Sequence, residues 1–398
     1  MTRVGRFTTL AAAKTKMALR ILIIPDKFKG TLTAQAAAKA IAAGWKSSRP
    51  EDALELLPMS DGGDGFGEIV SRLIGARPRK IRTVDAAHQP IHATWWWDRK
   101  SKTAVIESAK IVGLAMMPPK NFHPFQLDTF GLGNVLHATE KLGCRKCVIG
   151  IGGSATNDAG FGLARALGWQ FLDKAGGQIL CWTALDSLAQ IVAPRRLRVK
   201  VIVAVDVQNP LLGPCGATRV YGPQKGLRAK DFLRAENALS RLARISRRDL
   251  GADFAKVPGA GAAGGLGFGL LAFLGAQPES GFEIFAHAAN LKSRLGKTDL
   301  VLTGEGALDQ QTLMGKGVGQ VARLCRTMKI PCIGIAGVVL EPKKAKKLFS
   351  QTHGLTEITS AENAKAHPAK FLEKLATQIA TGWHPGPAGA SRPSWKCD

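Results

Sequence analysis

Short apolar runs alternate along this chain with polar, glycine-rich segments and with longer alanine- or leucine-rich segments. The apolar runs are rich in Val, Ile and Leu and have the length of strands, whereas the longer segments have the length of helices. In the first unit, residues 21–24 are apolar, and Thr31 or Thr33 then precedes a helical segment that carries Ile41 and Trp45. The repeated alternation predicts an α/β fold with a parallel sheet covered by helices.

Carboxylates recur just after the predicted strands. The strands are expected at 54–58, 104–106, 201–205 and 300–302, and the polar residues that follow them include Asp61, Glu107, Asp206 and Glu305. Ligands of parallel sheets bind beyond the carboxyl ends of the strands. Each of these acids alone is more simply explained as a helix cap or a turn residue. Their recurrence favours a site assembled from several strand ends.

The segment 148–158, with the sequence VIGIGGSATND, carries the strongest signal for a ligand site. An apolar strand leads directly into glycines, which let backbone N–H groups approach an anion closely. Ser154 and Thr156 add hydroxyl donors, and Asn157 or Asp158 can cap a helix over 161–167 whose N-terminal end favours negative charge. The segment predicts a phosphate-binding corner, in which Asp158 is alternatively a metal ligand.

The same glycines also fit the G-x-G-x-x-A pattern of a dinucleotide-binding unit, with Asp173 placed to bind a ribose hydroxyl. A third interpretation is a tight turn with a purely structural role. The segment alone therefore leaves open a phosphoryl-transfer enzyme, a nicotinamide-dependent dehydrogenase and a structural turn. The chain contains no P-loop of the form G-x-x-x-x-G-K-[ST], so a kinase would need a different phosphate cradle.

Length and charge narrow the class of protein. At 398 residues the chain exceeds the usual size of a single core, so we expect two domains. It has no uninterrupted apolar run of about 18 residues, so we expect no membrane association and a cytoplasmic protein. The net charge of +25 suits a nucleic-acid binder, but the basic residues are scattered and Tyr221 is the only tyrosine. A basic surface that attracts anionic substrates is the simpler explanation.

The cysteines and the termini add further expectations. Seven cysteines spread along the chain are typical of reduced thiols, and Cys147 of the isolated C-x-x-C pair is interpreted as a strand residue. Residues 1–19 contain basic but no acidic residues, which is typical of a transit peptide, and a true start at Met17 explains them equally well. The Pro-, Gly- and Ala-rich tail, 382–398, is expected to lie outside the packed core.

Six separated motifs together resemble one family, the type I glycerate kinases. In chain order they are 25–33 (PDKFKGTLT), 60–65 (SDGGDG), 150–158 (GIGGSATND), 206–214 (DVQNPLLGP), 222–226 (GPQKG) and 303–312 (TGEGALDQQT). Each motif is short. Their order and their spread from about residue 20 to about residue 382 make the combination specific.

The resemblance implies two α/β domains with the site in the cleft between them. A flavodoxin-like domain with a parallel sheet would be formed by both chain ends, residues 20–75 and 290–381, and a second α/β domain, residues 76–289, would be inserted. It also implies an ATP-dependent kinase that transfers the γ-phosphate to the 2-hydroxyl of D-glycerate, giving 2-phosphoglycerate and ADP, with Mg²⁺ as the accompanying ion. ATP and glycerate would be the partners, nucleic acid would not, and a homo-oligomer is left open.

Phosphoryl transfer needs cations and N–H donors around the phosphates, carboxylates for Mg²⁺ and a group that orients the attacking hydroxyl. On the matching motifs, the catalytic candidates are Asp26, Lys29, Asp61 and Asp206. The nucleotide- and phosphate-binding candidates are Gly152, Gly153, Ser154, Ala155, Thr156, Asn157 and Lys225, with Lys316 as a weaker one. The substrate-binding candidates are Lys27, Glu305 and Asp309, and the metal-binding candidates are Asp158 and Asp206.

Several positions depart from the family pattern. Lys27 stands in place of a serine, Asp64 of a glutamate, Phe66 of a threonine and Ala307 of an arginine, and the segment 121–124 lacks an expected arginine. A guanidinium binds a carboxylate through two hydrogen bonds, which alanine cannot do, so these changes bear on substrate recognition. A sensor that binds glycerate or nucleotide without turnover therefore remains an alternative to the enzyme.

Overall fold

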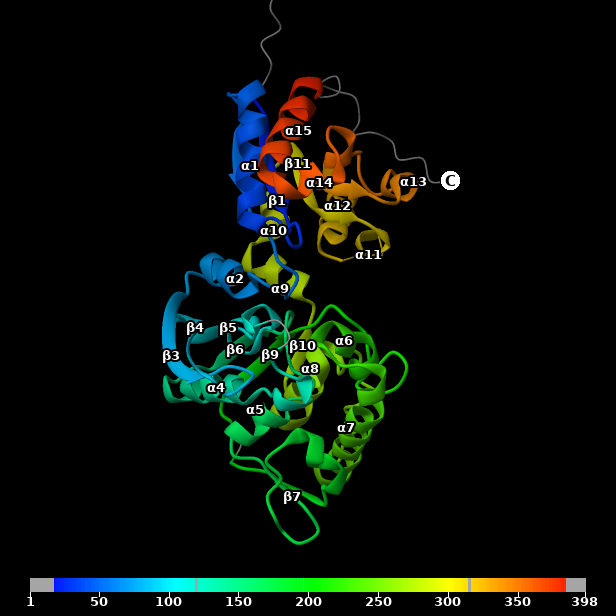
Figure 1. The fold of residues 1–398 in the computed structure, drawn as a ribbon. Coiled ribbons are helices and arrows are strands. Elements are labelled where there is room, and N and C mark those ends of the chain that lie inside the picture. Colours follow the sequence, from blue (N-terminus) through cyan, green and yellow to red (C-terminus); the bar gives the residue numbers. More distant parts are fainter. Residues whose placement is uncertain (1–17, 119–120, 196, 314–315, 384–398) are drawn as a thin grey trace, which may run out of the picture.

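The computed structural model describes residues 18–118, 121–195, 197–313 and 316–383. These residues form two sheets flanked by helices, one in each of two lobes that Figure 1 shows one above the other. Met17, all but the last two residues of the expected N-terminal segment 1–19, and all but the first two residues of the expected tail lie outside the described residues. Among the described helices, none is both long enough and apolar enough to cross a membrane.

The first sheet contains five parallel strands that come from both ends of the chain. In spatial order they are β2 (Ala53–Leu56), β1 (Arg20–Pro25), β11 (Leu300–Leu308), β12 (Cys332–Val339) and β13 (Gln351–Gly354). Numbered along the chain, this order is the 2-1-3-4-5 order of flavodoxin-like folds, whose ligands bind at the switch point between the first and third strands. The predicted α/β fold with a flavodoxin-like sheet is confirmed.

Helices cover both faces of the first sheet because apolar residues occupy both faces of its strands. Ile21 and Ile23 pack with α1 (Ala34–Ser48) and α15 (Pro368–Gly382). Thr33 caps α1, as predicted, since its hydroxyl accepts a hydrogen bond from the Ala36 amide. The other helices of this lobe are α10 (Leu291–Leu295), α11 (Gln310–Leu313), α12 (Gly317–Thr327), α13 (Pro342–Ala345), η4 (Leu355–Glu357) and α14 (Ala361–Ala366).

The second sheet is mixed. Its strands are, in spatial order, β10 (Gln277–Glu279), β9 (Lys200–Ala204), β6 (Lys146–Gly150), β5 (Thr103–Glu107), β4 (Pro90–Asp98) and β3 (Arg77–Val84). The first four are parallel, but β4 runs antiparallel to both β5 and β3. The alternation in the sequence did not predict this antiparallel pair: residues 85–89 between β3 and β4 suffice for a hairpin, whereas a parallel crossover needs a dozen or more.

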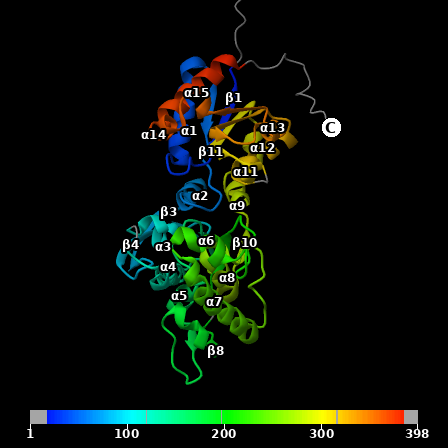
Figure 2. The ribbon, with the colours of Figure 1, turned by 45° about the vertical axis from the view of Figure 1, so that its right-hand side comes forward.

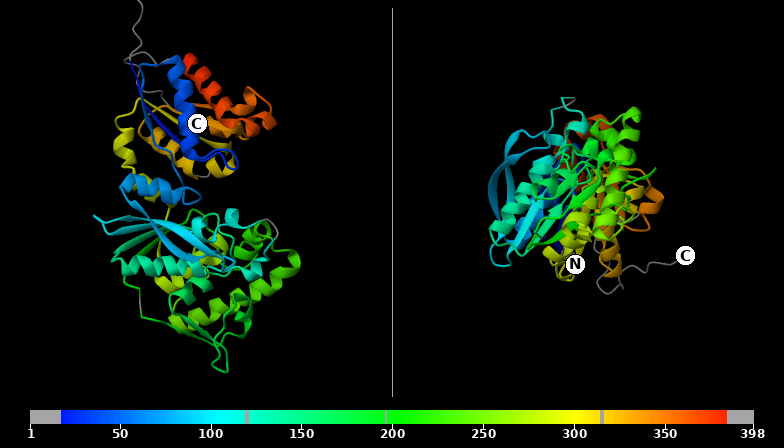
Figure 3. Two further views of the ribbon diagram at one scale, coloured as in Figure 1. Left: turned by 60° about the vertical axis from the view of Figure 1, so that its left-hand side comes forward. Right: turned by 90° about the horizontal axis from the view of Figure 1, so that it is seen from below.

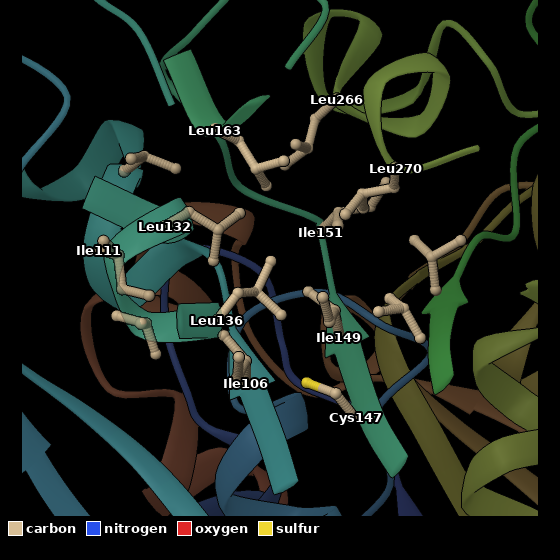
Figure 4. Packing of buried hydrophobic residues seen from close by; sticks show 14 of the residues in the cluster. Ile106, Ile111, Leu132, Leu136, Cys147, Ile149, Ile151, Leu163, Leu266 and Leu270 are labelled. Carbon is tan, nitrogen blue, oxygen red and sulfur yellow. The ribbon is translucent and has the colours of Figure 1, made fainter. Parts of the chain in front are cut away.

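One face of the second sheet carries the core drawn in Figure 4. Ile106, Cys147 and Ile149 of the strands meet leucines of α4 (Phe130–Lys141), α5 (Phe161–Ala166) and α8 (Ala262–Leu274). Cys147 lies on β6, as predicted, and its thiol is free. A further apolar cluster joins α5 to α7. The remaining elements are α3 (Ala109–Val112), η1 (Leu114–Met116), η2 (Pro124–Gln126), β7 (Gln170–Leu172), η3 (Trp182–Ser187), β8 (Gln190–Val192), α6 (Ala217–Lys225) and α7 (Ala229–Leu250).

Two helices, α2 (Phe66–Ile74) and α9 (Gly281–Ala288), lie between the two sheets (Figures 1, 2 and 3). Phe66 of α2 and Ile284 of α9 pack on the second sheet, whereas Phe282 and Phe285 of α9 pack on the first. Phe66, one of the positions that depart from the family pattern, is completely buried there. Because these helices contribute to the cores of both lobes, the expected domain boundaries at 75/76 and 289/290 stay predictions.

Candidate active site

Two cavities lie at the carboxyl ends of the two sheets. The first cavity, of about 630 Å³, lies over the ends of β1, β11 and β12, and the second cavity, of about 510 Å³, lies among the polar segments that follow β2, β6 and β9. Both cavities are lined by Lys27, Lys29, Asp61 and Lys316. We call these four residues the junction. The two cavities thus form one cleft whose middle carries three ammonium groups and one carboxylate.

The structure brings most of the predicted site residues to this cleft. Besides the junction, the first cavity is lined by Asp26, Glu305 and Asp309. The second cavity is lined by Gly152, Gly153, Ser154, Asp206 and Lys225. Four predicted residues line neither cavity and are buried behind the glycine segment: Ala155, Thr156, Asn157 and Asp158. Their predicted contact with a ligand therefore has no support in this geometry.

Glu305 lies within a strand rather than in the loop where the sequence places it. Strand β11 continues past residue 302 to Leu308, because residues 304–308 still pair with β12. The carboxylate of Glu305 accepts a 2.7 Å hydrogen bond from the Thr312 hydroxyl, and Thr312 belongs to the short helix α11. A strand and a helix thus fix the position of this side chain in the first cavity.

Negative charge is concentrated on both sides of the junction. Burial raises the pKa of Asp26 to about 7, and the nearby charge of Asp61 adds to the shift. Burial also raises the pKa of Glu305 to about 7, with Asp309 and Asp61 contributing. The pKa of Asp206, raised to about 6, has the same two causes, burial and Asp61. Perturbed carboxyl groups that act on one another in a cleft are typical of sites that bind cations or transfer protons.

Asp206 is held at the end of β9 by the start of α9. Its carboxylate accepts hydrogen bonds from the Ser280 hydroxyl (2.8 Å) and from the Gly281 amide (3.1 Å to each oxygen). Gly281 also lies against the segment that carries Asp61, since a Cβ atom at residue 281 would stand 2.2 Å from the Asp61 carbonyl oxygen. The absence of a side chain at Gly281 therefore brings Asp61 and Asp206 to the same part of the cleft.

The glycine segment after β6 touches the segment after β2. The Gly152 amide donates to the Gly62 carbonyl oxygen at 3.2 Å, and a Cβ atom at Gly152 would lie 2.7 Å from the Cα atom of Gly63. A Cβ atom at Gly153, whose φ is +79°, would lie 2.5 Å from an oxygen of Asp64. These glycines thus allow close contact between the lobes, a role that the sequence did not reveal.

The same segment retains part of its predicted capacity for an anion. Within the described residues, protein acceptors occupy the amides of Gly152, Ala155 and Thr156 but not those of Gly153 and Ser154. The Ser154 hydroxyl is engaged with that of Thr156 at 2.9 Å. Two residues that line the second cavity therefore have backbone donors without a described protein acceptor, fewer than the sequence suggests.

Lys225 adds a cation to these two amides. The residue is 7% exposed, and its ammonium group donates a 2.5 Å hydrogen bond to the Thr156 carbonyl oxygen. Burial lowers the pKa of Lys225 to about 7. No described carboxylate lies within ion-pair distance of it. The charge of Asp158 acts on Lys225 from beyond that distance, so an anion in the second cavity would add a close counter-charge.

Asp158 has a structural position, contrary to its predicted role as a metal ligand. Its completely buried carboxylate accepts hydrogen bonds from the Thr129 amide and hydroxyl and from the Gly162 amide, at 2.7–2.9 Å. It therefore joins the beginnings of α4 and α5, although the N-cap of α5 is Gly160 rather than the predicted Asn157 or Asp158. Across the described ranges, no group of three or more His, Cys, Asp or Glu side chains is arranged to hold a metal ion.

Asp173 does not occupy the position that the dehydrogenase interpretation requires. It follows β7, which pairs with β8 in a separate two-stranded sheet, and its carboxylate accepts hydrogen bonds from the Ala175 and Gly177 amides in a turn. A ribose-binding acid would stand at the end of a strand beside the glycine segment, in the same sheet. Figure 1 shows β7 at the far end of the second lobe, so the dinucleotide-binding interpretation is wrong.

Comparison with known proteins decides between the remaining interpretations. A family model described as the glycerate kinase family matches residues 21–384. The chain belongs to the glycerate kinase family. It is 38% identical over 373 residues to a glycerate kinase of Bacillus subtilis (strain 168), with 91% of this chain and 97% of that protein covered. It is 37% identical over 324 residues to the glycerate 2-kinase of Escherichia coli (strain K12), with 80% and 85% covered.

A solved structure agrees with this assignment. The crystal structure of putative glycerate kinase 2 from Salmonella typhimurium LT2 matches with a TM-score of 0.75 and 33% sequence identity, covering 92% of this chain and 98% of that one. The predicted family is confirmed, and so is the predicted enzyme class, a kinase.

Two carboxylates without a predicted site role, Glu107 and Asp64, hold parts of the cleft in this glycerate kinase family member. Glu107 accepts hydrogen bonds from the Gly65 and Gly67 amides, both at 3.0 Å, and so fixes the beginning of α2 just after Asp61. In the sequence, the only indication of a role for Glu107 was its position directly after a predicted strand. Lys27 and Asp64, two positions that depart from the family pattern, form a 3.1 Å ion pair at the edge of the cleft.

Proposed function

We propose that this kinase transfers the γ-phosphate of ATP to the 2-hydroxyl of D-glycerate, giving 2-phosphoglycerate and ADP. The names of its relatives support glycerate as the acceptor. The observation that carries the proposal is the junction, where Lys27, Lys29 and Lys316 line both cavities. Donor and acceptor must meet at one point, and fixed cations there stabilise the charge of a phosphoryl group during transfer.

Asp26 and Asp61 are the residues that would hold Mg²⁺. Protein sites for this ion commonly supply one or two carboxylates, with phosphate oxygens and water completing the shell. The raised pKa of Asp26, due to burial and to Asp61, reflects uncompensated negative charge that a divalent cation relieves. When bound, Mg²⁺ neutralises charge on the phosphates of the donor. This assignment replaces the predicted metal role of Asp158, which lies outside the cleft, and that of Asp206, whose oxygens are engaged by Ser280 and Gly281.

Asp206 is the residue that we assign as general base. It lies in the second cavity with a pKa of about 6, so it is mainly ionised at neutral pH and still able to accept a proton. The 2-hydroxyl of glycerate would give its proton to Asp206 while the hydroxyl oxygen attacks the γ-phosphorus. The bond between the γ-phosphorus and the bridging oxygen would break, and that oxygen would leave as part of ADP. Ser280 and Gly281 hold the orientation of the carboxylate during this step.

The test is ADP release by the purified protein with Mg-ATP and D-glycerate, with L-glycerate in parallel and the product identified by NMR. We expect ADP and 2-phosphoglycerate from the D enantiomer. ADP formation that does not depend on glycerate, or 3-phosphoglycerate as the product, would contradict the proposal. Tight binding of both ligands without turnover would favour the sensor instead.

The assignment of Asp206 makes a separate prediction. Asp206→Asn keeps the size of the side chain but removes the base, so we expect kcat to fall by about 10²–10⁴-fold. Asp173→Asn is the matched control, because that carboxylate lies in a distant turn, and its kcat should stay within about twofold of the unmodified protein. Equal losses in the two variants would contradict the role of Asp206.

A further inference from the structure

The two cavities offer different chemistry to the two substrates. Away from the junction, the first cavity reaches the ends of β12 and β13, where most of its lining is small or apolar: Gly337, Val338, Leu355, Ala361, Ala364 and Pro368. Thr356 and Lys365 are the polar residues of this end. We call it the apolar end. The second cavity instead contains the buried ammonium group of Lys225 and the free amides of Gly153 and Ser154.

We propose that the nucleoside of the phosphoryl donor binds at the apolar end of the first cavity, and that the carboxylate of the acid binds to Lys225, Gly153 and Ser154 in the second. The phosphates of the donor then run past β11 toward the junction. This inference rests on the proposed function. It reverses the expectation from the sequence that the glycine segment 152–157 binds the nucleotide.

The distribution of charge along the first cavity fits a nucleotide. A nucleoside triphosphate has an uncharged base at one end and the transferred phosphate at the other. The first cavity is apolar at one end and carries the three junction lysines at the other, beside the carboxylates of Asp26, Asp61 and Glu305. A three-carbon hydroxy acid has no apolar part that could occupy such an end. Burial of the base against Val338 and Leu355 would contribute through the hydrophobic effect.

The extent of the first cavity leads to the same assignment. The apolar end lies beside β12 and β13, and the junction lies beyond β1, so the cavity crosses three intervals between neighbouring strands. Strands lie about 4.8 Å apart, which gives a span of about 14 Å. With carbon–carbon bonds of about 1.5 Å, a three-carbon acid spans only about 5 Å. An elongated ligand is needed to fill this cavity.

The second cavity fits the acid because its lining includes a buried cation, Lys225, that forms no ion pair with a described carboxylate. The charge of Asp158 acts on it only from beyond ion-pair distance. A buried ammonium group is costly unless an anion or several hydrogen bonds compensate for it. Lys225 has one described hydrogen bond, to the Thr156 carbonyl oxygen. A carboxylate that accepts from Lys225 and from the Gly153 and Ser154 amides would compensate it, and would leave the adjacent 2-hydroxyl between Asp206 and the junction.

Calorimetric titrations with ADP and with D-glycerate test this arrangement. Ala361→Trp places a large side chain at the apolar end, and since Ala361 is exposed the change should leave the fold intact. We expect its Kd for ADP to rise at least 10-fold and its Kd for D-glycerate to stay within twofold. Ala366→Trp is the matched control, because Ala366 lies on the same helix, is exposed and is absent from the cavity lining. Thr356→Trp is a second variant for the same end.

The reciprocal variant is Gln224→Trp, at an exposed position that lines the second cavity. We expect its Kd for D-glycerate to rise at least 10-fold with little change for ADP. The opposite pattern, with Ala361→Trp weakening D-glycerate and Gln224→Trp weakening ADP, would overturn the arrangement. The arrangement would also be overturned if the unmodified protein is active and both the Ala361→Trp and Thr356→Trp variants bind ADP as tightly as it does. If the unmodified protein neither binds ADP nor turns over, it is the proposed function that fails.

Discussion

Half-buried Glu305 and buried Lys225 are ionisable residues of opposite sign, one in each cavity. Burial raises the pKa of Glu305 and lowers that of Lys225, each to about 7, because a low-dielectric environment disfavours the charged form. A ligand that brings the opposite charge favours that form again. At the scale of single residues, we therefore expect the binding of a charged ligand to change the ionisation of these two side chains.

Glu305 gives a prediction for stability as a function of pH. Its pKa in the folded protein, about 7, lies above its ordinary value of 4.5. Between pH 4.5 and 7 the folded state therefore binds more protons at this residue than the unfolded state. The stabilisation from the protonated side chain is fully present below pH 4.5 and is lost as the pH rises through 7. Glu305→Gln keeps an acceptor for the Thr312 hydroxyl and cannot ionise. Without ligands, we expect the variant to be more stable than the unmodified protein by roughly 1–3 kcal/mol at pH 7.5 and equally stable near pH 4.

The measurement is urea-induced unfolding at a series of pH values. Glu51→Gln, at an exposed position, is the control and should follow the unmodified protein throughout. A constant difference between Glu305→Gln and the unmodified protein at every pH would contradict the buried ionisation.

Lys225 gives a second prediction at this scale. Lys225→Met keeps most of the length and removes the charge, so we expect the Kd for D-glycerate to rise by about 10–100-fold, as for a lost charge-assisted contact. Because the protein no longer buries an ammonium group, we expect no loss of thermal stability at pH 7. Calorimetry and thermal unfolding measure the two quantities, with Lys230→Met at an exposed position of α7 as the control. Unchanged glycerate binding would exclude Lys225 from the acid site.

At the scale of elements, the cleft depends on how closely the segments after β2 and β6 approach one another. Gly152 and Gly63 touch through backbone atoms, and the Gly152 amide bonds to Gly62. Where the segment after β2 leads into α2, Glu107 accepts hydrogen bonds from two backbone amides at the beginning of that helix. The position of Asp61 therefore depends on contacts between elements of both lobes.

Gly152→Ala should disturb this contact. The added Cβ atom would lie 2.7 Å from the Cα atom of Gly63, so one of the two backbone segments must move. We expect kcat to fall at least 10-fold, since a displacement of about 1 Å at a reacting group has a large effect. Gly296→Ala is the control: its new Cβ atom would meet its nearest neighbours at 3.6 Å and its φ is −59°. Kinetic assays and thermal unfolding compare the two, and full activity of Gly152→Ala would contradict the role of this contact.

At the scale of the whole molecule, the two sheets are coupled through α2 and α9, which contribute to the apolar cores of both lobes. The cleft lies beside these helices, at the switch point of the first sheet and at the parallel strand ends of the second. Ligands in the two cavities therefore bridge lobes that share a layer of helices.

Thermal unfolding with ligands tests this coupling. A non-hydrolysable ATP analogue at 100 times its Kd should stabilise the protein by about 2.7 kcal/mol, and D-glycerate at 100 times its Kd by the same amount. We expect one cooperative transition whose midpoint rises further when both ligands are present. Asp61→Asn, at the junction, should reduce both effects. Two separate transitions, of which each ligand shifts only one, would contradict a shared cleft.

Much of the fold could be predicted from local patterns. Residues 21–24 alternate between two apolar faces and precede Thr33, whose hydroxyl caps α1 through a local hydrogen bond. The extension of β11 through Glu305 could not be predicted in this way, because it depends on pairing with β12. The same holds for the antiparallel direction of β4, which depends on its partners β3 and β5.

The sequence by itself determined the α/β class, the first three strands along the chain of the flavodoxin-like sheet, the family, and the glycine and carboxylate segments from which the cleft is built. These properties depend on short-range periodicity and on residues close together in the chain. Only the tertiary structure decided that Asp158 and Asp173 serve local structure, that Gly152 joins the lobes, and that Asp61 acts on carboxylates in both cavities. Burial, charge interaction and backbone contact between distant segments arise from packing, which no local pattern contains.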